Sequence, residues 1–125
     1  MTEWIYYDSK TGNVERFIQK LKALRNWNFI KIGEVEEPVH TGHLISFTTR
    51  FGEVPETTAA FMRSFSAHIE TISISGNRNW GANFAKAADK LQELYHLPIL
   101  MKFELSGTQV DVQQLINKIE ARYDH

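Results

Sequence analysis

Cysteine is absent from this chain of 125 residues, proline occurs only three times, and the net charge is only −1. The absence of cysteine excludes disulfides, thiolate metal sites and a catalytic thiol. The near balance of charge gives no indication of a nucleic-acid or acidic-polymer partner. No apolar run approaches the ~20 residues needed to span a membrane, and the first residues lack the basic and apolar pattern of a secretion signal. We therefore expect a cytoplasmic protein that binds neither nucleic acid nor a membrane.

Repeats, low-complexity tracts and linkers are also absent, so we expect residues 1–125 to form a single domain. Within it, two apolar patterns alternate. Short apolar runs typical of buried strands occupy 4–7, 29–32, 44–48, 69–75 and 99–105. Apolar residues recur at helical spacing after Val14, after Pro55, from Phe84 to Tyr95, and after Thr108, which can cap the last helix. Residues 33–43 are expected to form a loop.

This alternation favours a parallel sheet with helices on both faces, because each parallel connection must cross over the sheet. At this size the natural strand order is 2-1-3-4-5. Strands one, three and four are then neighbours, and the loops that follow them, 9–13, 49–54 and 76–81, meet at one edge of the sheet. Ligands of such sheets bind beyond the carboxyl ends of the strands, so these loops are the candidate site.

The first of these loops has the composition of a phosphate-binding turn. The hydroxyls of Ser9 and Thr11 and the free N–H groups at the start of the next helix can converge on one anion. Gly12 allows the backbone to approach that anion closely. Lys10 in such a turn more often points to solvent. The alternative is an ordinary turn that only caps the helix.

The other two loops carry aromatic residues beside glycine. Phe51 precedes Gly52, whose peptide can flip to meet a flat ligand. Trp80 lies among polar residues and glycines ahead of a helix, where its ring can stack on a planar ligand. The alternatives are that Phe51 folds back into the core and that Trp80 packs on Phe84. Together the loops indicate a mononucleotide-type cofactor, since the sequence contains neither a P-loop nor a dinucleotide fingerprint.

Longer stretches of the chain resemble a known family. Residues 8–14 (DSKTGNV) resemble the FMN phosphate loop of flavodoxins. Residues 75–81 (SGNRNWG), followed by Phe84, and residues 102–108 (KFELSGT) look like the NrdI family, the small flavodoxin-like proteins that serve class Ib ribonucleotide reductase. Residues 48–55 (TTRFGEVP) are similar to the middle flavin loop of that family. The resemblance covers essentially the whole chain and implies a flavodoxin-like three-layer α/β sandwich with a five-stranded parallel sheet in the order 2-1-3-4-5.

The resemblance also implies a function. The family binds FMN noncovalently, receives electrons from a donor, and its reduced flavin reacts with dioxygen to give an oxidant, taken to be superoxide. The oxidant passes to the small, radical-bearing subunit of the reductase for assembly of its radical cofactor. The protein would then be a redox accessory protein rather than a stand-alone enzyme. The alternative is a general electron-transfer flavodoxin. A phosphoacceptor receiver would need several acidic residues at the strand ends, where Asp8 is alone.

Carried over by position, the resemblance implies an FMN site without metal ligands, formed by Ser9, Lys10, Thr11, Gly12, Asn13, Val14, Thr48, Thr49, Arg50, Phe51, Gly52, Ser75, Gly76, Asn77, Arg78, Trp80, Gly81 and Phe84. Val14 stands where many flavodoxins have threonine, so its phosphate contact would come from the backbone. Arg50 places a cation in the middle loop.

Charge near the ring bears on the redox step. We expect Arg50 and Arg78, set against Glu53 and Asp8, to favour the anionic reduced flavin, unless both arginines point to solvent. Elsewhere, two features are interpreted as exposed loop. One is the pair His40 and His43, which lacks carboxylate or thiolate partners for a metal site. The other is the acidic run from Glu34 to Glu37, which also offers a surface to a partner.

Overall fold

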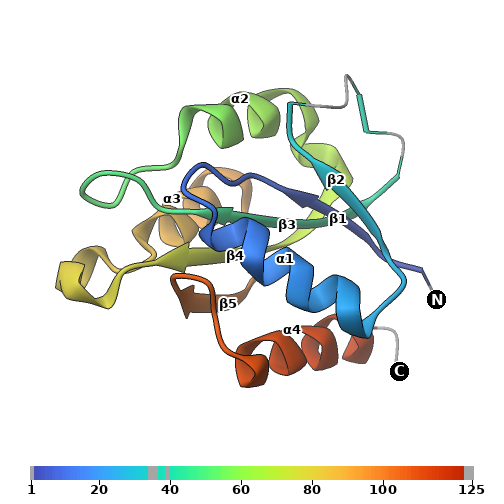
Figure 1. Ribbon diagram of the computed structural model, residues 1–125. Coiled ribbons are helices and arrows are strands. Elements are labelled where there is room, and N and C mark those ends of the chain that lie inside the picture. The colour runs from blue at the N-terminus through green and yellow to red at the C-terminus, as the bar shows by residue number, and fades with distance from the viewer. Residues whose placement is uncertain (1, 34–36, 39, 123–125) are drawn as a thin grey trace.

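The computed structural model describes residues 2–33, 37–38 and 40–122 (Figure 1). Its elements, in chain order, are β1 (Trp4–Tyr7), α1 (Asn13–Leu24), β2 (Asn28–Lys31), β3 (Gly42–Phe47), α2 (Glu56–Phe65), the 3-10 helix η1 (Ser66–His68), β4 (Ile69–Gly76), the 3-10 helix η2 (Arg78–Asn83), α3 (Lys86–Tyr95), β5 (Ile99–Glu104) and α4 (Gln109–Ala121). Of the acidic residues expected in an exposed loop, Glu34 and Glu36 lie outside the described residues, and Glu37 is exposed.

The five strands form one sheet in the order β2-β1-β3-β4-β5, and every pairing is parallel. Tyr6 is in register with Leu44, and Leu44 is in register with Ile72, so the three central strands are aligned. The predicted strand order and the parallel sheet are therefore confirmed.

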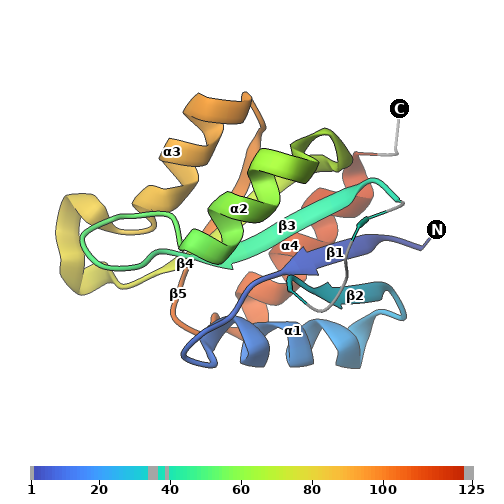
Figure 2. The same cartoon turned by 90° about the horizontal axis from the view of Figure 1, so that it is seen from above.

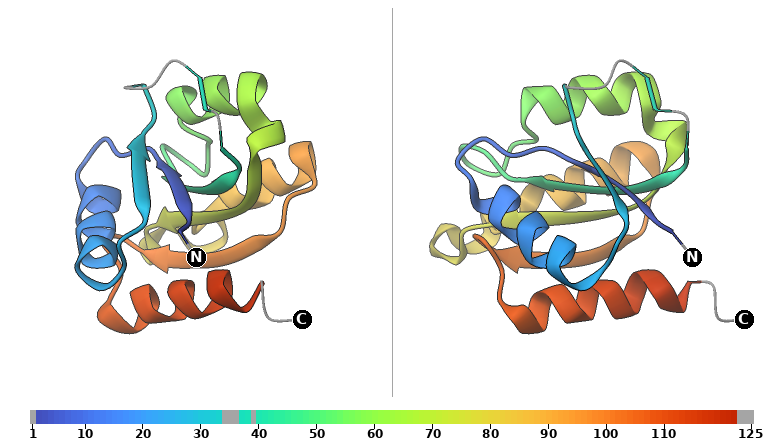
Figure 3. Two further views of the ribbon diagram at one scale, coloured as in Figure 1. Left: turned by 90° about the vertical axis from the view of Figure 1, so that its right-hand side faces the viewer. Right: turned by 45° about the vertical axis from the view of Figure 1, so that its right-hand side comes forward.

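Two hydrophobic clusters lie between the sheet and its helices, one on each face of the sheet. A strand can contribute to both clusters because its successive side chains point to opposite faces. Ile5 of β1 packs in one cluster with Phe17 of α1 and Ile116 of α4. The next residue, Tyr6, packs in the other cluster with Met62 of α2. Figure 3 shows α1 and α4 on one side of the sheet and α2 and α3 on the other, as the three-layer sandwich requires.

Helix α3 begins two residues later than the helical spacing predicts, and η2 occupies most of the expected polar loop. Gly81 has φ 54° and ψ −122°, which interrupts the helical turn. Phe84 follows with extended backbone, and Ala85 adopts a left-handed conformation at the start of α3. Phe84 is therefore a partly buried residue before the helix, although its spacing to Ala87 and Ala88 is helical.

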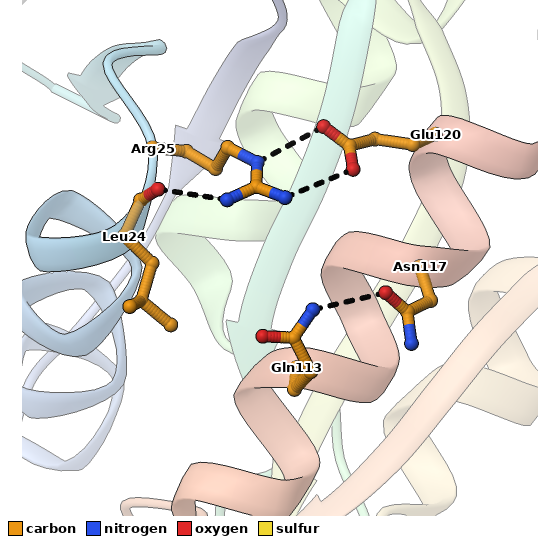
Figure 4. A network of polar contacts seen from close by, with 5 residues as sticks. All are labelled: Leu24, Arg25, Gln113, Asn117 and Glu120. Atoms are coloured by element: carbon orange, nitrogen blue, oxygen red, sulfur yellow. Dashed lines mark hydrogen bonds and ion pairs between the residues drawn. The ribbon is translucent and has the colours of Figure 1, made fainter.

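The two helices on one face are joined by an ion pair (Figure 4). The Arg25 guanidinium donates to both carboxylate oxygens of Glu120, at 3.0 and 3.1 Å, and to the Leu24 carbonyl at 2.9 Å. The hydrogen bond from Arg25 lowers the pKa of Glu120 below its ordinary value. Within α4, Gln113 donates to Asn117 at 2.9 Å. The predicted N-cap of this helix is also present, since the Thr108 hydroxyl accepts from the Asp111 N–H.

The interpretation of His43 as a solvated loop residue is wrong. His43 lies in β3 and is only 1% exposed. Its Nδ1 lies 2.7 Å from Thr71 Oγ1, and its Nε2 lies 3.2 Å from Glu3 Oε1. The polar residues around Gly42 indicate a loop, but they form the start of β3, the central strand of the sheet. Neighbouring strands and helices cover the His43 side chain there.

Burial of His43 has a consequence for stability at low pH. Desolvation lowers the pKa of His43, although Glu3 and Glu70 act in the opposite direction and Arg122 adds to the lowering. The unfolded chain therefore takes up a proton first as the pH falls below ~6.5, and stability is lost between that pH and the lower folded pKa. Urea unfolding at neutral pH and at about pH 5 should show this loss, and His43→Gln should reduce its size.

A matched control is His96→Asn, because His96 is exposed and asparagine tolerates its left-handed backbone. This variant is expected to keep the acid sensitivity of the unmodified protein. Equal acid sensitivity of His43→Gln and the unmodified protein would contradict the assignment.

Candidate functional site

Among the residues that the structure describes, no helix has the length and apolar character needed to cross a membrane. The loops after β1, β3 and β4 lie side by side at the carboxyl edge of the sheet, on the left in Figures 1 and 2. They enclose a cavity of about 320 Å³. The residues that line it and were predicted from the sequence are Ser9, Lys10, Thr11, Asn13, Val14, Thr48, Thr49, Arg50, Ser75, Gly76, Asn77 and Trp80.

The turn after β1 presents hydrogen-bond donors to this cavity. Ser9 Oγ accepts from the Glu15 N–H at 3.1 Å, which leaves the Ser9 proton free to be donated. Gly12 has φ 95° and stands directly before α1, as the turn requires. In the described structure the N–H groups of Asn13 and Val14 have no acceptor, as expected for the first turn of a helix. The Val14 side chain is buried in the core, so only its backbone can reach a ligand.

The carboxylate of Asp8, which directly follows β1, is hydrogen-bonded within the protein. Asp8 is 6% exposed, and its Oδ2 accepts from the hydroxyls of Thr57 and Thr58 at the start of α2. The Thr58 hydroxyl also lies 2.6 Å from that of Ser46. The carboxylate is thus held at a helix N-terminus, where the helix dipole favours it. Asp8 ties the phosphate turn to the segment that follows the middle loop.

The middle loop is a compact turn closed by backbone hydrogen bonds between Thr49 and Glu53, at 2.9 and 2.8 Å. Arg50 has φ 51° and Gly52 has φ 95°. A Cβ on Gly52 would lie 2.9 Å from Lys86 Cβ, so the loop rests against the start of α3. Phe51 is 85% exposed, and the alternative that it folds into the core is wrong. Neither Phe51 nor Gly52 lines the cavity.

The third loop holds Trp80 at the cavity with 37% of its surface exposed. The Trp80 N–H donates to the Asn77 carbonyl at 3.0 Å, and the Asn77 side chain accepts from the Asn79 N–H at 2.9 Å. Beside it, the Arg78 guanidinium lies 4.4 Å from the ring centroid of Phe84. Arg78, Gly81 and Phe84 therefore shape this loop without lining the cavity.

Two lining residues, Phe47 and Leu105, were not predicted from the sequence. Leu105 follows β5 with a positive φ of 52°. Its N–H donates to the Gly76 carbonyl at 2.9 Å, and its carbonyl accepts from Ser75 Oγ at 2.6 Å. Ser75 thus uses its hydroxyl to hold Leu105 at the cavity wall. The predicted strand order contained the signal, because the end of β5 had to lie beside the end of β4.

Arg50 and Arg78, the two arginines predicted to lie near the ring, are both paired. Arg50 lies 3.7 Å from Glu53, and Arg78 lies 3.9 Å from Glu104, whose carboxylate also accepts from the Arg78 N–H at 3.1 Å. All four side chains are largely solvent-exposed, so each pair is weak. The net positive charge near a bound ring is therefore smaller than the two arginines alone would suggest.

One residue of the cavity lining, Thr48, carries an unsatisfied polar atom. Thr48 Oγ1 is buried and has no hydrogen-bond partner within the described part of the chain. Such a group is costly unless a ligand or water satisfies it. The combination of a donor-rich turn, an unpaired hydroxyl and the Trp80 ring fits a ligand with a phosphate at one end and a polar-edged flat ring at the other.

This fold is that of a flavodoxin-like protein, and the cavity at the carboxyl edge of its sheet is the candidate ligand site. Among solved structures, oxidised flavodoxin 2 from Bacillus cereus matches with a TM-score of 0.72 and 19% identity, covering 100% of both chains. A short-chain flavodoxin associated with a bacterial microcompartment matches with a TM-score of 0.71 and 18% identity, covering 96% of this chain and 95% of that one. At these identities the likeness establishes the fold.

Sequence comparison identifies the family. The model of the NrdI flavodoxin-like family matches residues 5–117. Protein NrdI of Bacillus licheniformis is 46% identical over 117 residues, which are 93% of this chain and 86% of that protein. Protein NrdI of Macrococcus caseolyticus is 41% identical over 116 residues, 93% of this chain and 88% of that protein. The chain belongs to the NrdI flavodoxin-like family, and this membership implies a flavin cofactor and an association with ribonucleotide reductase.

The unpaired Thr48 hydroxyl leads to a test of the site. We expect Thr48→Val to leave the stability of the flavin-free protein unchanged or slightly higher, because it removes an unsatisfied buried group. The same change is expected to weaken flavin binding by about 1 kcal/mol, the net value of one hydrogen bond. Thermal unfolding and flavin titration measure the two effects.

Thr71→Val serves as the contrasting variant, because the Thr71 hydroxyl is paired with His43 and lies outside the cavity lining. It is expected to lower stability and leave flavin affinity unchanged. A clear loss of stability in flavin-free Thr48→Val would contradict the assignment of Thr48.

Proposed function

We propose that this protein binds FMN in the cavity between the three loops and uses it to activate a class Ib ribonucleotide reductase. The observation that carries the proposal is the convergence of a phosphate-type turn and the Trp80 ring on one cavity. A volume of about 320 Å³ lies at the lower end of the range for ligand pockets, as suits a cofactor whose ring edge stays open to solvent.

The phosphate of FMN would be held by the turn after β1. The Ser9 and Thr11 hydroxyls and the N–H groups of Asn13 and Val14 supply the donors, and the helix dipole of α1 favours the negative charge. Lys10 lines the same cavity but is exposed, so its contribution is screened by solvent.

The flavin ring would lie against Trp80 and Leu105, with polar contacts from the Thr48 hydroxyl and from the backbone of the loops at Thr49 and Asn77. When bound and reduced, FMN would supply the single electron that converts dioxygen to superoxide. We propose that the superoxide so formed reaches the small subunit of the reductase in the cytoplasm, for assembly of its radical cofactor. A separate electron donor restores the reduced cofactor.

Removal of the Trp80 ring should weaken FMN binding. Trp80→Ala is expected to cost about 1–2 kcal/mol of binding free energy, the value of an aromatic stacking contact. Trp80→Phe should recover part of this loss because it keeps a ring at the same place. Titration of the flavin-free protein, followed by quenching of flavin fluorescence, measures each affinity. An unchanged affinity in Trp80→Ala would remove Trp80 from the site.

The activation function is tested with one mixture: the FMN-loaded, reduced protein, dioxygen and the metal-loaded small subunit of a class Ib reductase. Electron paramagnetic resonance should detect a protein radical that is absent when this protein is left out. If FMN binds but no radical forms, while a known activator produces one, the general electron-transfer flavodoxin is favoured instead.

A further inference from the structure

The phosphate turn is tied to the loop after β5 by Arg16, near the start of α1. Arg16 Nε donates to Ser106 Oγ at 2.9 Å, and Arg16 Nη2 donates to Asn13 Oδ1 at 2.6 Å. Ser106 Oγ in turn donates to Asn13 Oδ1 at 2.9 Å. The three side chains thus close a cycle of hydrogen bonds, in which the guanidinium has a defined position despite its exposure to solvent.

This position lies against the backbone of the turn. A Cβ placed on Gly12 would lie 2.8 Å from Arg16 Nη1, so the guanidinium packs directly against the backbone of the turn at Gly12. The opposite side of the cycle is also held, since Lys20 Nζ donates to the carbonyls of Ser106 and Gly107, at 3.2 and 2.7 Å. In the described structure no carboxylate is paired with Arg16. A fixed and unneutralised cation therefore stands beside the donors of the phosphate turn.

We propose that Arg16 is a positioning residue that makes this site select phosphorylated flavin over riboflavin. It acts through Asn13, whose side chain it orients and whose N–H is one of the donors at the start of α1 that have no acceptor within the described residues, and through its fixed positive charge. The positive charge attracts the phosphate of FMN. Riboflavin has no phosphate and is uncharged at that end, so it gains nothing from this charge. This inference rests on the proposed binding of FMN.

The test compares two ligands on the flavin-free protein, FMN and riboflavin, with fluorescence titration at low and at physiological salt. Arg16→Gln is expected to weaken FMN binding about tenfold, the size of one charge-assisted interaction, and to leave riboflavin binding unchanged. Its FMN affinity should also vary less with salt than that of the unmodified protein. Arg16→Lys keeps the charge but cannot bridge Asn13 and Ser106. Its FMN affinity should lie between those of Arg16→Gln and the unmodified protein.

The matched control is Arg63→Gln, because Arg63 is an exposed arginine on α2 outside the cavity lining. It should bind both flavins as the unmodified protein does. If Arg16→Gln lost as much affinity for riboflavin as for FMN, the inference would be overturned and Arg16 would be a purely structural residue. An unchanged FMN affinity would overturn it as well. If Arg16→Gln fails to fold, Arg16→Lys replaces it in the test. A lower ratio of FMN affinity to riboflavin affinity than in the unmodified protein supports the inference, and an unchanged ratio overturns it. Failure of the unmodified protein to bind either flavin would instead reject the proposed function.

Discussion

Replacement of Gly76 by alanine is expected to destabilise the protein by about 3 kcal/mol and to abolish most flavin binding. A Cβ at this position would lie 2.4 Å from the backbone nitrogen of Ala85 and 2.8 Å from its Cα. Backbone atoms cannot rotate away as a flexible side chain can, so β4 and the start of α3 must separate. Gly76 lines the cavity, and its carbonyl accepts from the Leu105 N–H, so the separation also displaces the cavity wall.

Gly33→Ala is the control for this experiment. Gly33 has φ 97°, but a Cβ there would meet nothing within 4 Å. That variant is expected to cost only the strain of a left-handed residue, about 1–2 kcal/mol, and to keep its flavin affinity. Urea unfolding and flavin titration of both variants separate the clash from backbone strain. A Gly76→Ala protein with normal stability and affinity would contradict the close packing described for β4 and α3.

Loss of the Asp8 carboxylate is expected to have the second-largest effect. Asp8→Ala removes the acceptor of two hydroxyl groups, those of Thr57 and Thr58, and opens a small cavity at the end of β1. Hydrogen bonds to charged groups contribute about 1.5–3 kcal/mol each, and Thr58 can still bond to Ser46, so we expect a net loss of about 2–3 kcal/mol. Flavin affinity should fall as well, because Asp8 fixes the phosphate turn relative to the segment after the middle loop.

Asp8→Asn provides the graded comparison, since it keeps an acceptor of the same size and should lose less stability than Asp8→Ala. Asp89→Ala is the control for a surface carboxylate, because Asp89 pairs with Lys102 at 2.7 Å while both side chains are partly exposed. That exposed pair should contribute at most about 1 kcal/mol. If Asp8→Ala lost no more stability than Asp89→Ala, the buried carboxylate would have no special structural role.

The strand order and the layers of this fold could be predicted from the sequence because burial leaves a clear pattern in it. Runs such as Ile72 to Ile74, covered by helices on both faces, differ from the helical spacing of Phe17, Ile18 and Leu21. Where burial and local composition disagree, the prediction is wrong. His43 is the example, since its polar neighbours indicate a loop while the sheet buries it.

Much of the candidate site was also predictable, for a related reason. A parallel sheet brings the ends of its strands to one edge, so the order of the strands is enough to bring the turn at Ser9 near the loop at Trp80. Residues whose role depends on long-range contacts were missed. Leu105 reaches the cavity because Ser75 and Gly76 hold its backbone, and Arg16 reaches the turn because Ser106 accepts its hydrogen bond across 90 residues of sequence.

The sequence by itself determined the class of fold, the edge of the sheet that carries the candidate site and the family, because each of these depends on residue types and local spacing. Only the tertiary structure decided which side chains are free. Asp8 and Ser75 are already hydrogen-bonded within the protein, whereas the Thr48 hydroxyl has no partner in the described structure. The physical reason is that a side chain can hydrogen-bond a ligand only through donors or acceptors that the protein itself has not already paired. The groups that pair with them come from distant parts of the chain.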